Sequence, residues 1–140
     1  MGRPLAGLLV AFVLAVTGGD ARAHHSYAMF DQENPIELEG VVEEFKFTNP
    51  HTFILLVVKQ QDGTTATWSL EGLSPSGLVR DGWTGKTLKP GDEIKVKIAP
   101  LRSGAPGGSW SARQISYRDG RPIDVGASTA TAPNSAAPSQ

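Results

Sequence analysis

Short segments in which apolar and polar residues alternate constrain the fold of this chain more than any other feature. A period of two is typical of β-strands that bury one face. In the first segment the phase slips after Gly40, at Val41-Val42, as a β-bulge or a sharp bend would produce. The expected strands are a long bent segment over 36–48, an apolar run over 53–58, and alternating runs over 66–70, 94–98 and 110–115.

Turn and helix signals separate these segments. Asp62-Gly63 is a strong hairpin signal between the second and third strands. Ser74-Pro75 predicts an N-cap and a first-turn proline, which open a short helix that runs to Arg80. A loop rich in glycine, serine and proline over 103–109 precedes the last strand. This order predicts a mainly β fold, a small five-stranded OB-like Greek-key barrel with one short helix between strands 3 and 4, whose closure leaves no open edge.

The start of the chain is typical of an exported protein. Arg3 precedes an apolar run over 5–16, and Ala21 and Ala23 place small residues where signal peptidase cuts. The run is too short to span a bilayer as a helix, so we expect a periplasmic or secreted protein without a membrane span after cleavage. The expected organisation is a signal peptide over 1–23, an N-terminal arm over 24–33, the barrel domain over 34–125 and a disordered tail over 126–140, which has no charged residue.

Composition excludes several classes of function. The chain contains no cysteine, so disulfides and thiol chemistry are excluded. With a formal net charge of −1, the chain lacks the excess of positive charge that nucleic-acid binding requires. We therefore expect no nucleic-acid partner. Neither a nucleophile motif nor a phosphate-binding loop occurs, so we expect a protein that is not an enzyme.

Several short motifs follow one another along the chain. They are His24-His25-Ser26-Tyr27, Glu39-Gly40-Val41-Val42, Thr48-Asn49-Pro50-His51, Trp68-Ser69-Leu70-Glu71, Ser74-Pro75-Ser76-Gly77-Leu78, Gly82-Trp83 and Leu88-Lys89-Pro90-Gly91-Asp92. In these motifs, between His24 and Tyr117, the chain resembles an uncharacterised family of small exported bacterial proteins, a domain of unknown function. The resemblance implies export and a small β-barrel, and it supplies neither an activity nor site residues.

The three histidines are the strongest candidates for chemistry. Cleavage after Ala23 would place His24 at the free amino terminus, where its α-amine and its ring can bind one metal ion. His51 directly follows the Asn49-Pro50 bend, and its ring could join them if the arm folds back. Three nitrogen donors in a nearly planar arrangement suit Cu(II) and are similar to the donor set of a histidine brace. The amine, with a reference pKa of about 7.7–8.0, loses its proton to a metal at modest cost near neutrality.

Other arrangements of the histidines remain open. Adjacent side chains of an extended segment point in opposite directions, so His24 and His25 do not readily share a metal through their rings alone. Cleavage after Ala21 would instead create a terminal Arg22-Ala23-His24 chelate for copper or nickel. In the alternative without metal, both terminal histidines are solvated and His51 caps the bend or binds a backbone carbonyl.

Glu71 and three tryptophans are the remaining candidates. Glu71 could bind a ligand or support one, but we favour an interaction with the helix dipole or with Arg80. Trp68 alternates inward and is expected in the core, while Trp83 is expected to plug a barrel end. Trp110 follows the flexible loop and is the best candidate for an exposed ligand contact.

These observations favour a periplasmic, non-enzymatic binding protein that holds copper through His24, His25 and His51 and acts in metal buffering, delivery or sensing. The alternative is a metal-free OB-like module that binds a periplasmic protein, a peptide or a small ligand on the barrel face, around Trp110 and Glu71. A copper oxidoreductase that uses the same donors ranks last, because no substrate groove is visible in the sequence.

Overall fold

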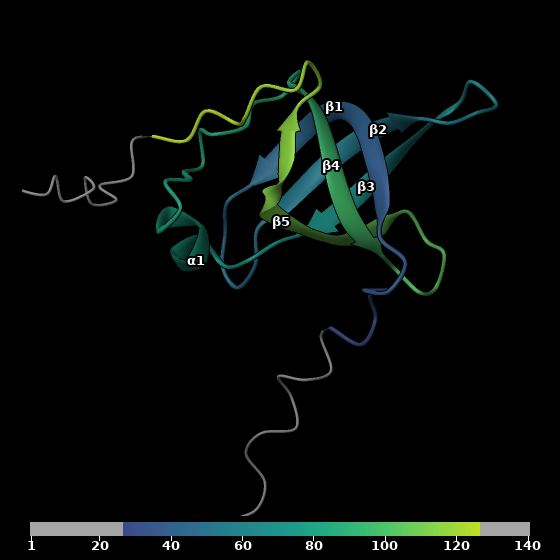
Figure 1. The fold of residues 1–140 in the computed structure, drawn as a ribbon, viewed down its shortest axis with the longest axis horizontal. Helices are drawn as coiled ribbons and strands as arrows, with labels where there is room; N and C mark the ends of the chain where they lie inside the picture. The colour runs from purple at the N-terminus through teal and green to yellow at the C-terminus, as the bar shows by residue number, and fades with distance from the viewer. Residues whose placement is uncertain (1–26, 127–140) are drawn as a thin grey trace, which may run out of the picture.

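The computed structural model describes residues 27–126, which form a closed five-stranded barrel (Figure 1). The strands follow one another around the barrel in the order β1-β2-β3-β5-β4. The expected mainly β architecture, with one short helix between strands 3 and 4, is confirmed. The elements are β1 (Ile36–Lys46), β2 (Phe53–Lys59), β3 (Thr65–Glu71), α1 (Pro75–Val79), β4 (Glu93–Pro100) and β5 (Gly107–Tyr117). The expected signal peptide, and all of the expected tail except Gly126, lie outside the described residues.

The long first strand, β1, pairs with two neighbouring strands. Its first half, Ile36–Val41, pairs with β4, and its second half, Val41–Lys46, pairs with β2. The register to β2 shifts between Val42 and Glu44, so the phase slip in the sequence is a β-bulge. The bulge lets a single strand turn from one side of the barrel to the other, as a small closed sheet requires.

A short parallel contact between β3 and β5 closes the barrel. It consists of the register pairs Ser69↔Gly107, Leu70↔Gly108 and Glu71↔Ser109. At Gly108, β5 is also packed tightly against β4, because a Cβ atom there would lie 2.6 Å from the carbonyl oxygen of Ala99 and 2.7 Å from Cδ1 of Ile98. The expectation of a loop over 103–109 is therefore wrong in its second half, because pairing with β3 makes Gly107–Ser109 a strand.

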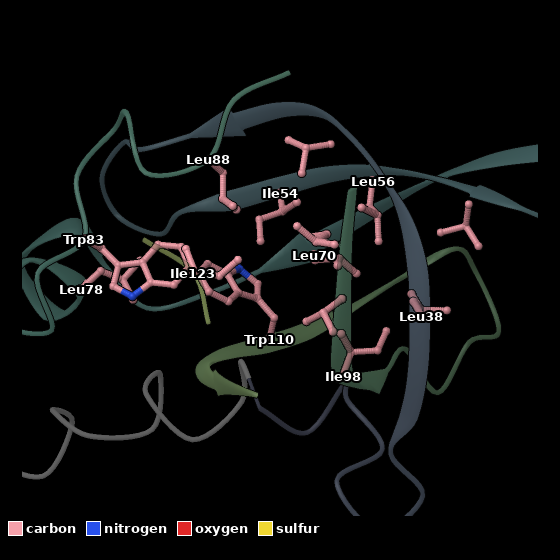
Figure 2. Packing of buried hydrophobic residues seen from close by; sticks show 14 residues of the cluster. Leu38, Ile54, Leu56, Leu70, Leu78, Trp83, Leu88, Ile98, Trp110 and Ile123 are labelled. Atoms are coloured by element: carbon pink, nitrogen blue, oxygen red, sulfur yellow. The ribbon is translucent and has the colours of Figure 1, made fainter. Parts of the chain in front are cut away.

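The barrel interior holds one continuous apolar cluster. Ile54, Leu56, Leu70 and Ile94 are completely buried. At the end of the barrel nearest α1, Trp83 packs beside Leu78 and Ile123, and Trp110 extends toward them from β5 (Figure 2). The ring centroids of Trp83 and Trp110 lie 5.2 Å apart. Trp83 is thus buried at the barrel end, and Trp68 packs against the cluster from a partly buried position.

Helix α1 is shorter than the sequence suggested. Arg80 is its C-cap, and Gly82, at φ 82°, ends the turn that follows. Ser74 occupies the N-cap position, but its hydroxyl lies 3.0 Å from the Ser76 hydroxyl and caps no backbone N–H group. Within residues 27–126, no helix has the length and apolar character needed to cross a membrane.

Replacing Gly108 tests how strongly the barrel depends on the close packing of β5 against β4, next to the β3–β5 contact. We expect Gly108→Ala to lower the free energy of unfolding by about 1–3 kcal/mol, because the added methyl group overlaps the β4 backbone at Ala99, which can move away only if the two strands separate. Urea denaturation measures the change. Gly85→Ala is the matched control, since its nearest neighbour, Cβ of Phe47, would lie 3.4 Å away. Equal stability of the two variants would contradict this view of closure.

Candidate functional site

A cavity of about 350 Å³ lies between the N-terminal arm and the barrel. Its walls come from the arm, from the loop before β2, and from the strands next to the β3–β5 contact. In OB folds the β1–β2 and β4–β5 loops flank the usual ligand-binding face, and His51 belongs to the first of these loops. The lining residues are Tyr27, Phe30, Gln32, Pro35, His51, Glu71, Gly72, Leu73, Lys97, Ile98, Ala99, Ser109, Trp110, Ser111 and Gln114.

Two of the sequence candidates meet in this cavity. The Nδ1 atom of His51 contacts the Oε1 atom of Glu71. The register explains this contact, because Glu71 lies opposite Phe53, two residues beyond His51. Both side chains keep access to solvent, with 41% of the His51 and 25% of the Glu71 side chain exposed. The favoured interpretation of Glu71 was wrong, since its position at the end of β3 directs the carboxylate to His51 and not to Arg80 or the helix.

Trp110 is also part of the cavity wall, although the expectation that it is exposed was wrong. Only 6% of Trp110 is exposed, because the indole ring lies over Gly72 inside the barrel. A Cβ atom on Gly72 would come within 2.5 Å of the indole Nε1 atom and within 2.8 Å of the Thr52 hydroxyl. Gly72, directly after Glu71, was the sequence signal that a bulky side chain passes close to the backbone here.

The arm is fixed to the barrel beside this cavity. Phe30 is only 4% exposed and forms a bridge with Leu101. On either side of it, the Asp31 N–H group donates to the Pro100 carbonyl at 2.8 Å, and the Arg102 N–H group donates to the Met29 carbonyl at 2.9 Å. A buried aromatic anchor with flanking backbone hydrogen bonds holds an otherwise short terminal segment in place.

Asp31 adds polar and electrostatic interactions to the arm, which we call the Asp31 lock. Its carboxylate accepts hydrogen bonds from the side-chain amide of Asn34 at 3.0 Å and from the backbone N–H group of Glu33 at 3.2 Å. The Arg102 guanidinium lies 3.7 Å away. Chiefly through the Asn34 hydrogen bond, these groups hold the pKa of Asp31 below its ordinary value of 3.8.

His24 and His25 lie outside the described residues. In the sequence, His24 is three positions before Tyr27, which lines the same cavity as His51. Between Tyr27 and Gly126, no three side chains of histidine, cysteine, aspartate or glutamate are grouped as a metal site.

Sequence reasoning missed most of the cavity wall. Phe30 and Lys97 carried only weak signals, an aromatic residue in a polar arm and a cation on the outer face of an alternating strand. Neither pattern indicates a cavity until the arm is docked. His51 and Glu71 are the two candidates that the structure brings into direct contact, and Trp110 lies beside them.

The fold and the cavity define a small OB-like barrel with a docked N-terminal arm. The chain belongs to a family of unknown function, DUF6152, whose profile matches residues 11–111. No match to a curated protein was found.

Among solved structures, the chain is similar to two crystal structures of the mitochondrial single-stranded DNA-binding protein Rim1 from S. cerevisiae. The sequence identities are 11% and 9%, and the TM-scores are 0.45 and 0.43. Each similarity covers 61% of this chain, and 93% and 94% of the two Rim1 chains. Similarity at this level does not establish a shared ligand.

Removing the aromatic anchor should free the arm while the barrel stays folded. We expect Phe30→Ala to accelerate hydrogen exchange at the amides of Asp31 and Arg102, because both bond across the arm–barrel boundary. Exchange in β2 should change little. Tyr27→Ala is the control, since that side chain is 59% exposed. Retained protection of both amides in Phe30→Ala would show that the aromatic ring is not the anchor.

The Asp31 lock should also make the arm sensitive to acid. The pKa of Asp31 is lower in the folded state than its ordinary 3.8, so above that pH ionised Asp31 stabilises the turn over 31–34 and, through Arg102, its link to the barrel. This contribution is lost as the pH falls through the lowered value. In an NMR titration, the side-chain amide signals of Asn34 should shift with a midpoint below 3.8. Asp31→Asn should abolish that shift, and a midpoint at or above 3.8 would contradict the lock.

Proposed function

We propose that the protein is an exported, non-enzymatic copper-binding protein whose ion lies in the cavity between the N-terminal arm and the barrel. The observation that carries this proposal is the contact between His51 and Glu71 in the cavity wall. The fold alone would not suggest a metal, because OB-like barrels serve many unrelated functions.

The geometry of the His51–Glu71 pair is the one that metal sites use. A histidine that binds a metal commonly donates its second ring N–H group to a carboxylate, which fixes the ring and makes the ligating nitrogen more basic. Here Nδ1 of His51 faces Glu71, so the Nε2 atom is the nitrogen left for a ligand. Glu71 would then be a positioning residue that holds the imidazole ring and compensates the charge of the ion.

The remaining donors would come from the processed chain start. Cleavage after Ala23 would create an α-amine on His24, three positions before Tyr27, which lines the cavity. The amine, the His24 ring and Nε2 of His51 make three nitrogen donors, a set that favours Cu(II) over the other common divalent ions. His25, whose ring would point away from that of His24 in an extended chain, has a supporting role at most.

A reversible copper site on a small exported barrel suits buffering, delivery or sensing. His51 is 41% exposed, so an ion bound there stays accessible to solvent and to exchange. A chain start that folds onto the ion can also lift away with it, since the arm before Tyr27 is short and carries two of the donors. These properties favour transfer of copper over retention for catalysis.

Copper titration of the mature chain is the central test. A protein that starts at His24, verified by mass spectrometry, should bind one equivalent of Cu(II) in competition with a chelator, with nitrogen hyperfine structure in its EPR spectrum. His51→Ala should weaken binding at least tenfold, and Glu71→Gln should weaken it about ten- to one-hundredfold through the loss of ring orientation. Copper should raise the melting temperature of the mature chain only.

Three controls separate this site from simpler ones. One additional residue before His24 should remove the amine donor and most of the affinity. His25→Ala should leave the affinity within about threefold, because its ring is not a required donor. If His51→Ala binds copper as tightly as the mature chain does, the metal is held by a local terminal chelate. No uptake by the verified mature chain would end the copper proposal, and copper-dependent oxidase activity would contradict the non-enzymatic role.

A further inference from the structure

One part of the cavity wall, which we call its basic end, differs from the His51–Glu71 contact. There the wall is formed by Lys97 on β4 and by Ser111 and Gln114 on β5. Lys97 and Gln114 also line a second hollow of about 300 Å³, together with Glu37, Lys95 and Arg113. The two hollows therefore adjoin at Lys97 and Gln114.

An irregularity in the sheet creates this basic end. The register between β4 and β5 runs from Val96↔Ile115 to Ile98↔Trp110. Residues 111–114 of β5 therefore form a bulge opposite the single residue Lys97. Bulges change the direction of side chains and occur often beside binding sites. Arg113 and Gln114 lie in this bulge, which explains how a strand that pairs regularly elsewhere lines the same hollow as Lys97.

Within residues 27–126, neither Lys97 nor Arg113 forms an ion pair. Glu37 lies opposite Lys97 in the register of β1 and β4 and lines the same hollow. The nearby carboxylates of Glu37 and Glu39 are engaged by Lys95, at 3.1 Å and 3.3 Å. Lys97 and Arg113 thus offer an ammonium and a guanidinium group to an anion from outside, and guanidinium matches the geometry of a carboxylate with two hydrogen bonds.

Next to these cations the cavity wall is apolar. Ile98 and Trp110 are almost fully buried but line the cavity, and Leu73 is half-exposed at its rim. A volume of about 350 Å³ lies in the range of small-molecule sites, which combine apolar walls with a few polar groups that fix orientation. A ligand that fits both parts has an anionic head and a small apolar body.

We infer that this end of the cavity binds a small organic carboxylate, whose carboxylate group lies between Lys97 and Arg113 and whose apolar body lies against Ile98 and Trp110. The inference goes beyond copper binding and does not depend on it, because none of these four residues is among the proposed copper donors. The Ser109 and Ser111 hydroxyls and the Gln114 amide supply hydrogen bonds along the path between head and body.

Binding of 3-phenylpropionate to the metal-free mature chain tests this site. NMR titration in buffer stripped of metal ions should show saturable shifts of the Trp110 indole signal, with the Trp68 signal as an internal control because Trp68 does not line this cavity. The neutral 3-phenylpropionamide should bind at least tenfold more weakly, since it lacks the charge. Acetate and inorganic phosphate should also bind at least tenfold more weakly, since they lack the apolar body.

Charge variants locate the head group. Lys97→Gln and Arg113→Gln should each weaken binding of 3-phenylpropionate about threefold, and the double variant about tenfold, as expected for exposed ion pairs. Lys59→Gln is the matched control, because Lys59 forms no ion pair within residues 27–126 and lines neither hollow. Equal affinity of the acid and its amide, or no effect of the double variant, would overturn the inference. Loss of copper binding in His51→Ala would leave this result unchanged, so the two proposals fail separately.

Discussion

Three residue pairs between β3 and β5 close the barrel, and the cavity of the candidate site depends on that closure. His51 and Glu71 come from the β2–β3 side of the contact, whereas Lys97 and Trp110 come from the β4–β5 side. Without the contact, these residues would lie on separate edges of an open sheet and would line no common cavity. On its other side, β5 lies close to β4 because Gly108 has no side chain between β5 and the backbone of Ala99.

The barrel itself could be predicted from the sequence because burial of one strand face imposes a period of two on the residues. The phase slip beyond Gly40 indicated the bulge of β1 for the same reason. The β3–β5 contact left no such pattern. Its β5 partners Gly107 and Gly108 carry no apolar side chain, and a parallel contact between distant strands depends on the folded neighbours. The second half of the loop expected over 103–109 is therefore a strand.

The site was predictable only in part, and the limit has a physical cause. His51 was visible because histidine is rare in this chain and follows a proline bend. Glu71 was assigned to Arg80 or the helix because those groups lie near it in sequence, while the register of two strands places it beside His51. Trp110 seemed exposed because a flexible loop precedes it, yet Gly72 leaves space for its ring inside the barrel. Contacts between distant segments decide both positions.

The docked arm would contribute to the affinity of the proposed copper site. If the amino terminus and the His51 imidazole were unconnected, bringing them together would cost entropy and weaken the binding of an ion between them. The contacts of Phe30 and Asp31 would lower this cost, since only two residues lie between Tyr27 and His24 in the sequence. The second donor then acts at a high effective concentration, as in other tethered systems. The proposed site would also depend on processing, because a chain with residues before His24 has no terminal amine at that residue. Copper binding of this kind would therefore begin only after export.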